Sequence, residues 1–212
     1  METKLTEQES LTLIGEMIKQ ARNNFRKGSG NSMIYYGFTV SVMAFIQVIL
    51  VFIFAKSGIN PNQSNWIWCL MIPAIFVGRL IGKKVERESM VKTHIDSIFS
   101  SIWNGYLYST VMFLLVIFCI GFGKKMYDLF FLIIPVTLIL IGFAEFVSAR
   151  TGRFKPYLYG TVIMWLGALV CIALMWSPSP VVFQMLILAI CMFFGFVIPG
   201  YQLNKLAKEE NV

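Results

Sequence analysis

Six long apolar segments, separated by short polar connections, follow one another along most of the chain. Each is long enough to cross about 30 Å of hydrocarbon as an α-helix that rises about 1.5 Å per residue. A helix is expected because backbone polar groups must be satisfied internally in lipid. The predicted spans are residues 32–55, 66–82, 98–121, 129–148, 157–176 and 181–203. We therefore predict an all-α, polytopic membrane protein with six transmembrane helices.

An amphipathic helix is predicted before the first span. Thr6, with Glu9 three residues later, is a capping-box pattern, and Gly28 supplies a C-cap before a Gly-Ser-Gly hinge. At about 100° per residue the apolar residues fall on one arc of this helix and the charged ones on the opposite arc. The face expected to contact lipid or a partner is formed by Leu11, Ile14, Met17, Ile18 and Phe25.

The positive charges predict the orientation and divide the chain. With both termini inside, 15 of the 18 lysines and arginines lie in cytoplasmic pieces, and only Lys56, Lys124 and Lys125 lie outside. Cytoplasmic loops carry such an excess. We expect a multi-pass protein of the cell inner (cytoplasmic) membrane, with both termini in the cytoplasm. It would comprise a cytoplasmic helix and hinge (1–31), a six-helix membrane domain (32–204) and a cytoplasmic tail (205–212).

Composition agrees with a lipid environment. Hydrophobic residues make up 57% of the 212 positions and charged residues 14%, against roughly 45–50% and 25% in soluble domains. The formal charge of +7 sits between the apolar runs and forms no basic stripe with interleaved aromatics, so nucleic acid is not expected as a partner. The expected partners are the bilayer and, through residues 6–27, anionic lipid or a cytoplasmic protein. A homo-oligomer is compatible with the sequence.

Two charged residues fall within the predicted spans, where charge is costly and often functional. Arg79 lies four residues before Lys83, and Glu145 five before Arg150, so both lie about 6–8 Å below the inner interface. Their matching depth and opposite sign predict an ion pair between the second and fourth helices, acting either as a cytoplasmic gate or as a structural lock; alternatively, Arg79 snorkels. The uncharged polar residues expected to hydrogen-bond neighbouring helices are Gln47, Asn104, Thr137 and Gln184.

Small residues and prolines add weaker signals. Gly37, Gly105 and Gly160 each lie a few residues inside the cytoplasmic end of an odd-numbered helix, beside aromatics, which suggests three helical hairpins derived from one unit. The Gly78-x-x-x-Gly82 spacing favours close helix packing. Prolines that can kink spans and free backbone carbonyls are Pro73, Pro135 and Pro199.

No catalytic, cofactor-binding or metal site is predicted, and the chain is not expected to be an enzyme. The four cysteines lie in different apolar runs without a CxxC spacing, so they read as packing residues. The single histidine, His94, has only Asp96 nearby. The predicted spans contain no aspartate, histidine or lysine, which intramembrane proteolysis or lipid chemistry would need.

Three stretches resemble a group of small bacterial inner-membrane proteins of uncharacterised function. They are the leader from Glu9 to Ile18, Tyr35-Tyr36-Gly37 at the start of the first span, and residues 91–96 before Trp103. The resemblance implies a helical membrane fold and transfers no catalytic or binding residue.

Two functions follow from these features. The first is a non-enzymatic regulatory or accessory protein that acts through its cytoplasmic N-terminal helix. The second is a small transporter or channel with Arg79 and Glu145 at a cytoplasmic-side gate.

Overall fold

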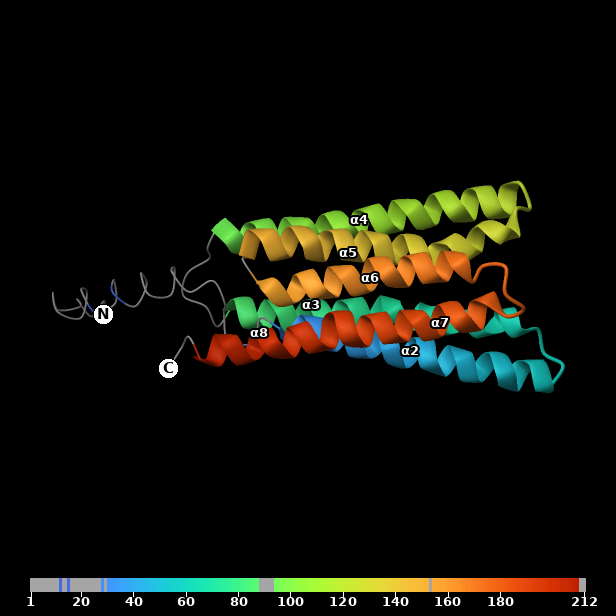
Figure 1. Cartoon of the computed structure of the whole chain (residues 1–212), viewed down its shortest axis with the longest axis horizontal. Coiled ribbons are helices and arrows are strands. Elements are labelled where there is room, and N and C mark those ends of the chain that lie inside the picture. The colour runs from blue at the N-terminus through green and yellow to red at the C-terminus, as the bar shows by residue number, and fades with distance from the viewer. Residues whose placement is uncertain are drawn as a thin grey trace, which may run out of the picture.

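The chain folds as a bundle of long helices, seen in the computed structural model in Figure 1. The structure describes residues 12, 15, 28, 30–87, 94–152 and 154–209, and these contain no strand. Six helices are long and apolar enough to cross a membrane: Asn31–Lys56, Pro61–Lys84, Ser97–Gly123, Tyr127–Gly152, Lys155–Ala173 and Pro180–Glu209. The all-α, six-span prediction is confirmed at this level.

Three of these spans are single helices and three change helix type along their length. The single ones are α2 (Asn31–Lys56), α4 (His94–Gly123) and α6 (Lys155–Ala173). Tighter 3-10 turns, η1 (Pro61–Leu70) and η2 (Tyr127–Leu132), lead into α3 (Met71–Arg87) and α5 (Ile133–Gly152). The last span consists of α7 (Pro180–Met192), a wider π-turn η3 (Phe193–Val197) and α8 (Ile198–Glu209). The start of α2 and the end of α8 lie at the same end of the bundle (Figure 1).

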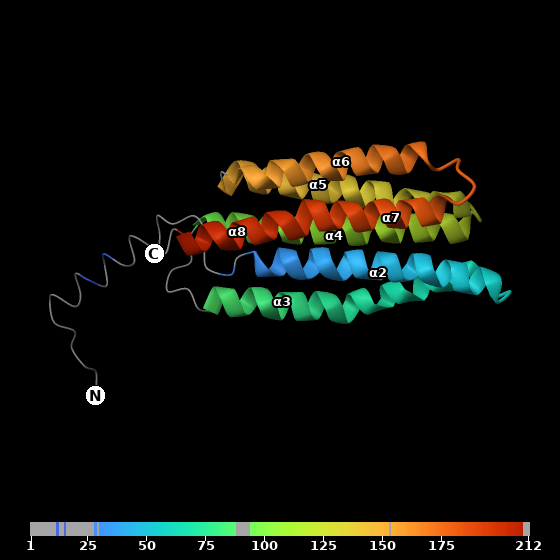
Figure 2. The same cartoon turned by 60° about the horizontal axis from the view of Figure 1, so that its bottom comes forward.

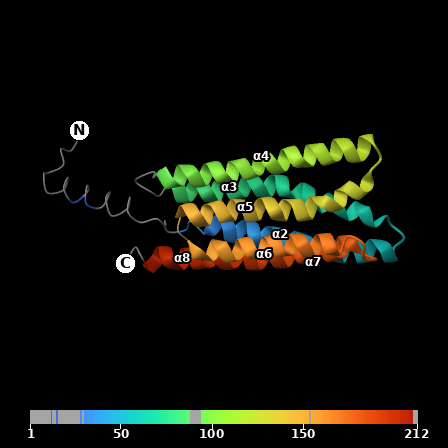
Figure 3. The same ribbon diagram turned by 45° about the horizontal axis from the view of Figure 1, so that its top comes forward.

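The helices pack in an order that differs from their order along the chain. Helix α2 packs on α3 and α7, α7 also on α6, α6 on α5, and α5 on α4; Figures 2 and 3 show this arrangement from two sides. Helices α3 and α4 are outermost, since only 11% of the apolar stretch of each span is buried, against 39% for the span ending in α5. The interior therefore lies among α2, α5, α6 and the α7–α8 span.

Glycines allow the inner helices to approach closely. A β-carbon at Gly30 would lie 2.0 Å from the carbonyl oxygen of Gly200, and one at Gly37 would lie 2.7 Å from the β-carbon of Phe196. Small residues are common at membrane helix interfaces because they let backbones meet. The Gly78 motif has the same use: a β-carbon there would meet the Tyr36 ring of α2.

Two of the polar residues predicted to join helices do so. The side-chain amide of Gln47 donates to Asn65 and accepts from the indole N–H of Trp68, which ties α2 to η1. Gln184 of α7 donates to the backbone carbonyl of Phe131 in η2. Both glutamines are buried, so these bonds satisfy groups that lipid could not.

For Thr137 and Asn104 the prediction of a hydrogen bond to a neighbouring helix was wrong. The hydroxyl of Thr137 donates to the carbonyl of Ile133, and the amide of Asn104 donates to Ser100, each one turn back in its own helix. The side chain of Asn104 is also exposed, because α4 lies at the edge of the bundle.

The predicted N-terminal amphipathic helix lies outside the described residues, apart from isolated positions within it. The side chains of His94 and Asp96 also lie outside the described part.

Candidate functional site: a buried carboxyl between three helices

Glu145 is the acidic side chain placed deepest in the described bundle. It lies in α5, seven residues before the helix ends at Gly152, or about 10 Å along the axis. Its side chain is 0% exposed. Neither carboxyl oxygen has a hydrogen-bond partner among the described residues. Buried polar groups nearly always have partners, so an isolated carboxyl marks a position that needs a functional explanation.

The carboxyl group faces two other helical segments. A β-carbon at Gly160 of α6 would lie 2.8 and 2.9 Å from the two Glu145 carboxyl oxygens and 2.7 Å from the backbone carbonyl oxygen of Gly195 in η3. Three oxygen acceptors from α5 and η3 therefore converge beside the α-carbon of Gly160. Any larger residue at 160 would occupy the space that these oxygens share.

The backbone near Gly195 is irregular, and the sequence explains why. Pro199 follows four residues later and has no N–H, so it cannot form the α-helical hydrogen bond to the Gly195 carbonyl. The helix widens here instead, and the N–H of Ile198 donates to the carbonyl of Phe193, five residues back. Single π-turns of this kind often occur at functional sites.

Aromatic rings connect α4 with α6 and with η3. Tyr157 of α6 is buried, and its ring contacts Phe99 of α4 at 6.5 Å and Phe154 at 5.0 Å between centroids. Trp103 of α4 packs edge-on against Phe196 of η3 at 5.6 Å. These contacts pack α4 against α6 and η3.

A hydroxyl lies on the same helix face as the carboxyl. Ser148 follows Glu145 by three residues in α5 and therefore lies on the same side of the helix. It is 0% exposed, and its oxygen has no hydrogen-bond partner among the described residues. The interior thus contains a second unsatisfied polar group one turn from the carboxyl.

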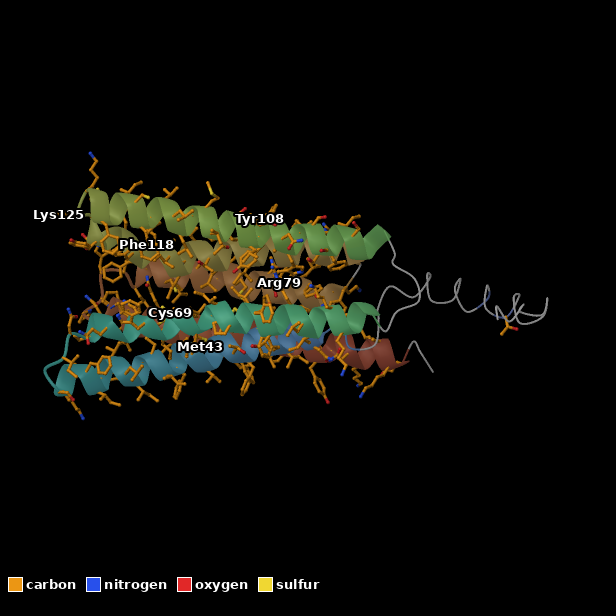
Figure 4. All side chains as sticks on the ribbon, turned by 180° about the vertical axis from the view of Figure 1, so that it is seen from behind. Met43, Cys69, Arg79, Tyr108, Phe118 and Lys125 are labelled. Carbon is orange, nitrogen blue, oxygen red and sulfur yellow. The ribbon has the colours of Figure 1, made fainter. Side chains whose placement is uncertain are left out.

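The predicted Arg79–Glu145 ion pair is wrong. Arg79 lies on the outer helix α3 and has an exposed side chain. Figure 4 labels it there, and labels the exposed Tyr108 on the other outer helix, α4. Helix α3 packs mainly on α2, whereas α5 packs mainly on α4 and α6. Equal depth does not bring two side chains together when their helices lie on different sides of the bundle.

Other candidate chemistry is not supported in the described part of the chain. No group of three or more His, Cys, Asp or Glu side chains is arranged to hold a metal ion among the described residues. Cys171 and Cys191 are buried, and Cys69 and Cys119 are exposed. The Cys191 thiol donates to the carbonyl of Ile163 on α6, a helix-packing contact.

The glycine repeat seen in the sequence has a partial counterpart in the structure. Gly37 and Gly160 are both buried against η3. Gly105 is exposed, and a β-carbon there would meet nothing within 4 Å. The third glycine therefore has no packing role like that of the other two.

The candidate partner face of the leader, Leu11, Ile14, Met17, Ile18 and Phe25, lies outside the described residues. Sequence reasoning identified Glu145 but missed Gly160 and Gly195 as its neighbours. Pro199 predicted that a backbone carbonyl in the last span loses its helical donor, but not that this carbonyl lies beside the Glu145 carboxyl.

Comparison with known proteins finds no matching protein family, no matching curated protein and no matching solved structure.

Proposed function

We propose that this protein is a small membrane transporter in which Glu145 binds and releases the cation that is transported or that drives transport. One observation supports this most: a fully buried carboxyl in an apolar helix, with no hydrogen-bond partner among the described residues. An ionised carboxylate in that place requires a bound cation, and a neutral one carries a proton. Either form holds a positive ion at membrane depth.

The proposed architecture is three helical hairpins with both termini in the cytoplasm, in the inner membrane of a bacterial cell. The excess of positive residues on one side of the predicted topology supports this orientation. Glu145 then lies in the cytoplasmic half of the bilayer. Transporters commonly place ion sites where the regular geometry of a membrane helix is interrupted, and the π-turn η3 interrupts the last span.

The test is ion flux into proteoliposomes that contain the full-length chain. An inside-negative potential is applied, and uptake is followed with a trapped pH dye for protons and with a radioactive tracer for Na⁺. We expect the wild type to carry one of these ions and Glu145→Gln to lose more than nine-tenths of that flux. Glutamine has nearly the same shape as glutamate, so the variant should still fold.

The matched control is Glu209→Gln, because Glu209 is an exposed glutamate near the end of α8. It removes the same charge from the chain without touching the buried site, so its flux should equal that of the wild type. Absence of both fluxes in the wild type, or full flux in Glu145→Gln, would refute the proposal.

A second function, regulation through the leader, is favoured by how the leader joins the bundle. The backbone N–H of Gly30 donates to the side chain of Asn204 in α8, and Asn204 donates to Asn31. The point where the leader enters α2 is therefore tied to the helix that follows η3. We propose that a cytoplasmic protein or anionic lipid bound to residues 6–27 acts through this link. If deletion of residues 1–27 leaves both partner capture and flux unchanged, this second proposal fails.

A further inference from the structure

We propose that the ion held at Glu145 is a proton, and that the carboxyl group shares it with the Gly195 carbonyl, to which Pro199 offers no N–H. This inference rests on the proposed transport function, since it names the ion that Glu145 binds. It follows from three features of the site, which concern the acceptors, the available space and the neighbouring charges.

The first feature is the excess of acceptors. The Glu145 oxygens and the Gly195 carbonyl oxygen all lie within 3 Å of one point beside Gly160. Two acceptors that face each other repel unless a donor lies between them. A protonated carboxyl supplies one O–H donor, and a carbonyl has lone pairs to accept it. Because Pro199 has no N–H, the α-helical donor that would compete with the carboxyl for the Gly195 carbonyl is absent.

The second feature is the space. A metal cation such as Na⁺ requires several oxygen ligands arranged around it. Here the α-carbon of Gly160 adjoins the point where the three oxygens converge. A proton needs no coordination shell and takes up almost no volume. The packing therefore favours a proton over a metal ion.

The third feature is the set of groups that face the carboxyl. Tyr157 of α6 and Cys191 of α7 are two titratable side chains that interact electrostatically with Glu145. Helix α4, which packs on α5, has no charged residue from Ser97 to Gly123. Asp128 in η2 lies at the opposite end of the α5 span. The positive residues on the two nearest helices, Arg150 of α5 and Lys155 of α6, have exposed side chains, whereas the carboxyl is buried.

The experiment is a ¹³C NMR titration of the full-length chain in lipid nanodiscs. The protein is labelled at the glutamate side-chain carboxyl carbons, and Glu145→Gln identifies the Glu145 signal by its loss. The signal is followed from pH 4 to pH 10 in Na⁺ and in choline at equal ionic strength. We expect a single titration whose midpoint is the same in both salts.

Two further signals test the role of the Gly195 carbonyl. Its own ¹³C resonance should titrate with the same midpoint as Glu145, which requires no variant. In Pro199→Ala the restored N–H competes for that carbonyl, so the Glu145 midpoint should shift. Pro73→Ala, in the exposed part of α3, is the matched control and should leave the midpoint unchanged.

The outcomes separate this inference from the proposed function. A midpoint that falls as Na⁺ rises identifies a metal-cation site and overturns the proton. The absence of any titration would also overturn the proton, because the carboxyl group would then neither bind nor release one between pH 4 and pH 10. A Gly195 resonance that does not respond overturns the shared hydrogen bond. A Na⁺-independent titration without flux in proteoliposomes supports the proton site and refutes transport.

Discussion

Replacing Gly160 by alanine tests the packing of the buried carboxyl site. The added methyl group would lie 2.7 Å from the Gly195 carbonyl oxygen and 2.8 Å from a Glu145 oxygen. Both distances are too short for a carbon atom. One neighbour is backbone, so relief requires that α6 and the α7–α8 span separate. Overpacking of this kind costs about 1–3 kcal/mol.

The matched control is Gly105→Ala in α4, where an added β-carbon meets nothing within 4 Å. Both substitutions remove a glycine from a helix, which by itself stabilises by about 0.5–1 kcal/mol. That contribution cancels when the two variants are compared. The difference in unfolding free energy should therefore equal the overpacking cost, about 1–3 kcal/mol, with Gly160→Ala the less stable.

The assay is reversible unfolding of detergent-solubilised protein by increasing SDS, followed by tryptophan fluorescence. Wild type, Gly160→Ala and Gly105→Ala are measured in the same mixed micelles. Equal free energies for the two variants would refute the close approach of α5, α6 and η3. A Gly160→Ala variant more stable than Gly105→Ala would also refute this close approach.

Further predictions concern other helix contacts and the leader. Gln47→Leu leaves the partly buried Trp68 N–H without its acceptor and should destabilise by about 1–2 kcal/mol in the same assay; an unchanged midpoint would argue against that bond. Gly78→Val should push the Tyr36 ring off α3 and lower stability by about 1–3 kcal/mol, and a neutral effect would show that α2 and α3 do not meet there. Deletion of residues 1–27 should leave membrane insertion intact, as judged by resistance to alkaline extraction.

The number and type of the helices could be predicted from the sequence because lipid imposes one simple rule. A run of about 20 apolar residues must form a helix to satisfy its backbone. The ends were less predictable. The second span begins at Pro61, before the predicted start at residue 66, because Asn60 caps η1 and Asn65 pairs with Gln47. Asn60 and Asn65 are polar and precede the apolar run, so the sequence alone places them in a loop.

The position of Glu145 along its span was predictable, but its neighbours were not. Depth follows from counting residues along a helix. The neighbours depend on which helices adjoin and on how each is rotated, and no local pattern gives either. This is why the sequence pairs Arg79 with Glu145 although their helices do not pack on each other. The site instead formed where Gly160 and the Pro199-dependent π-turn let α6 and η3 approach α5.

A double-mutant cycle in the SDS assay tests most directly whether the Glu145 carboxyl is isolated from the charge on Arg79, as the proposed ion site requires. Arg79→Ala is made in the wild type and in Glu145→Gln. Because Arg79 is exposed on α3 and Glu145 is buried in α5, the two effects should add to within about 0.5 kcal/mol. An interaction energy of about 1 kcal/mol or more would show that the two charges are coupled, and would contradict the isolated carboxyl on which the proposed ion site depends.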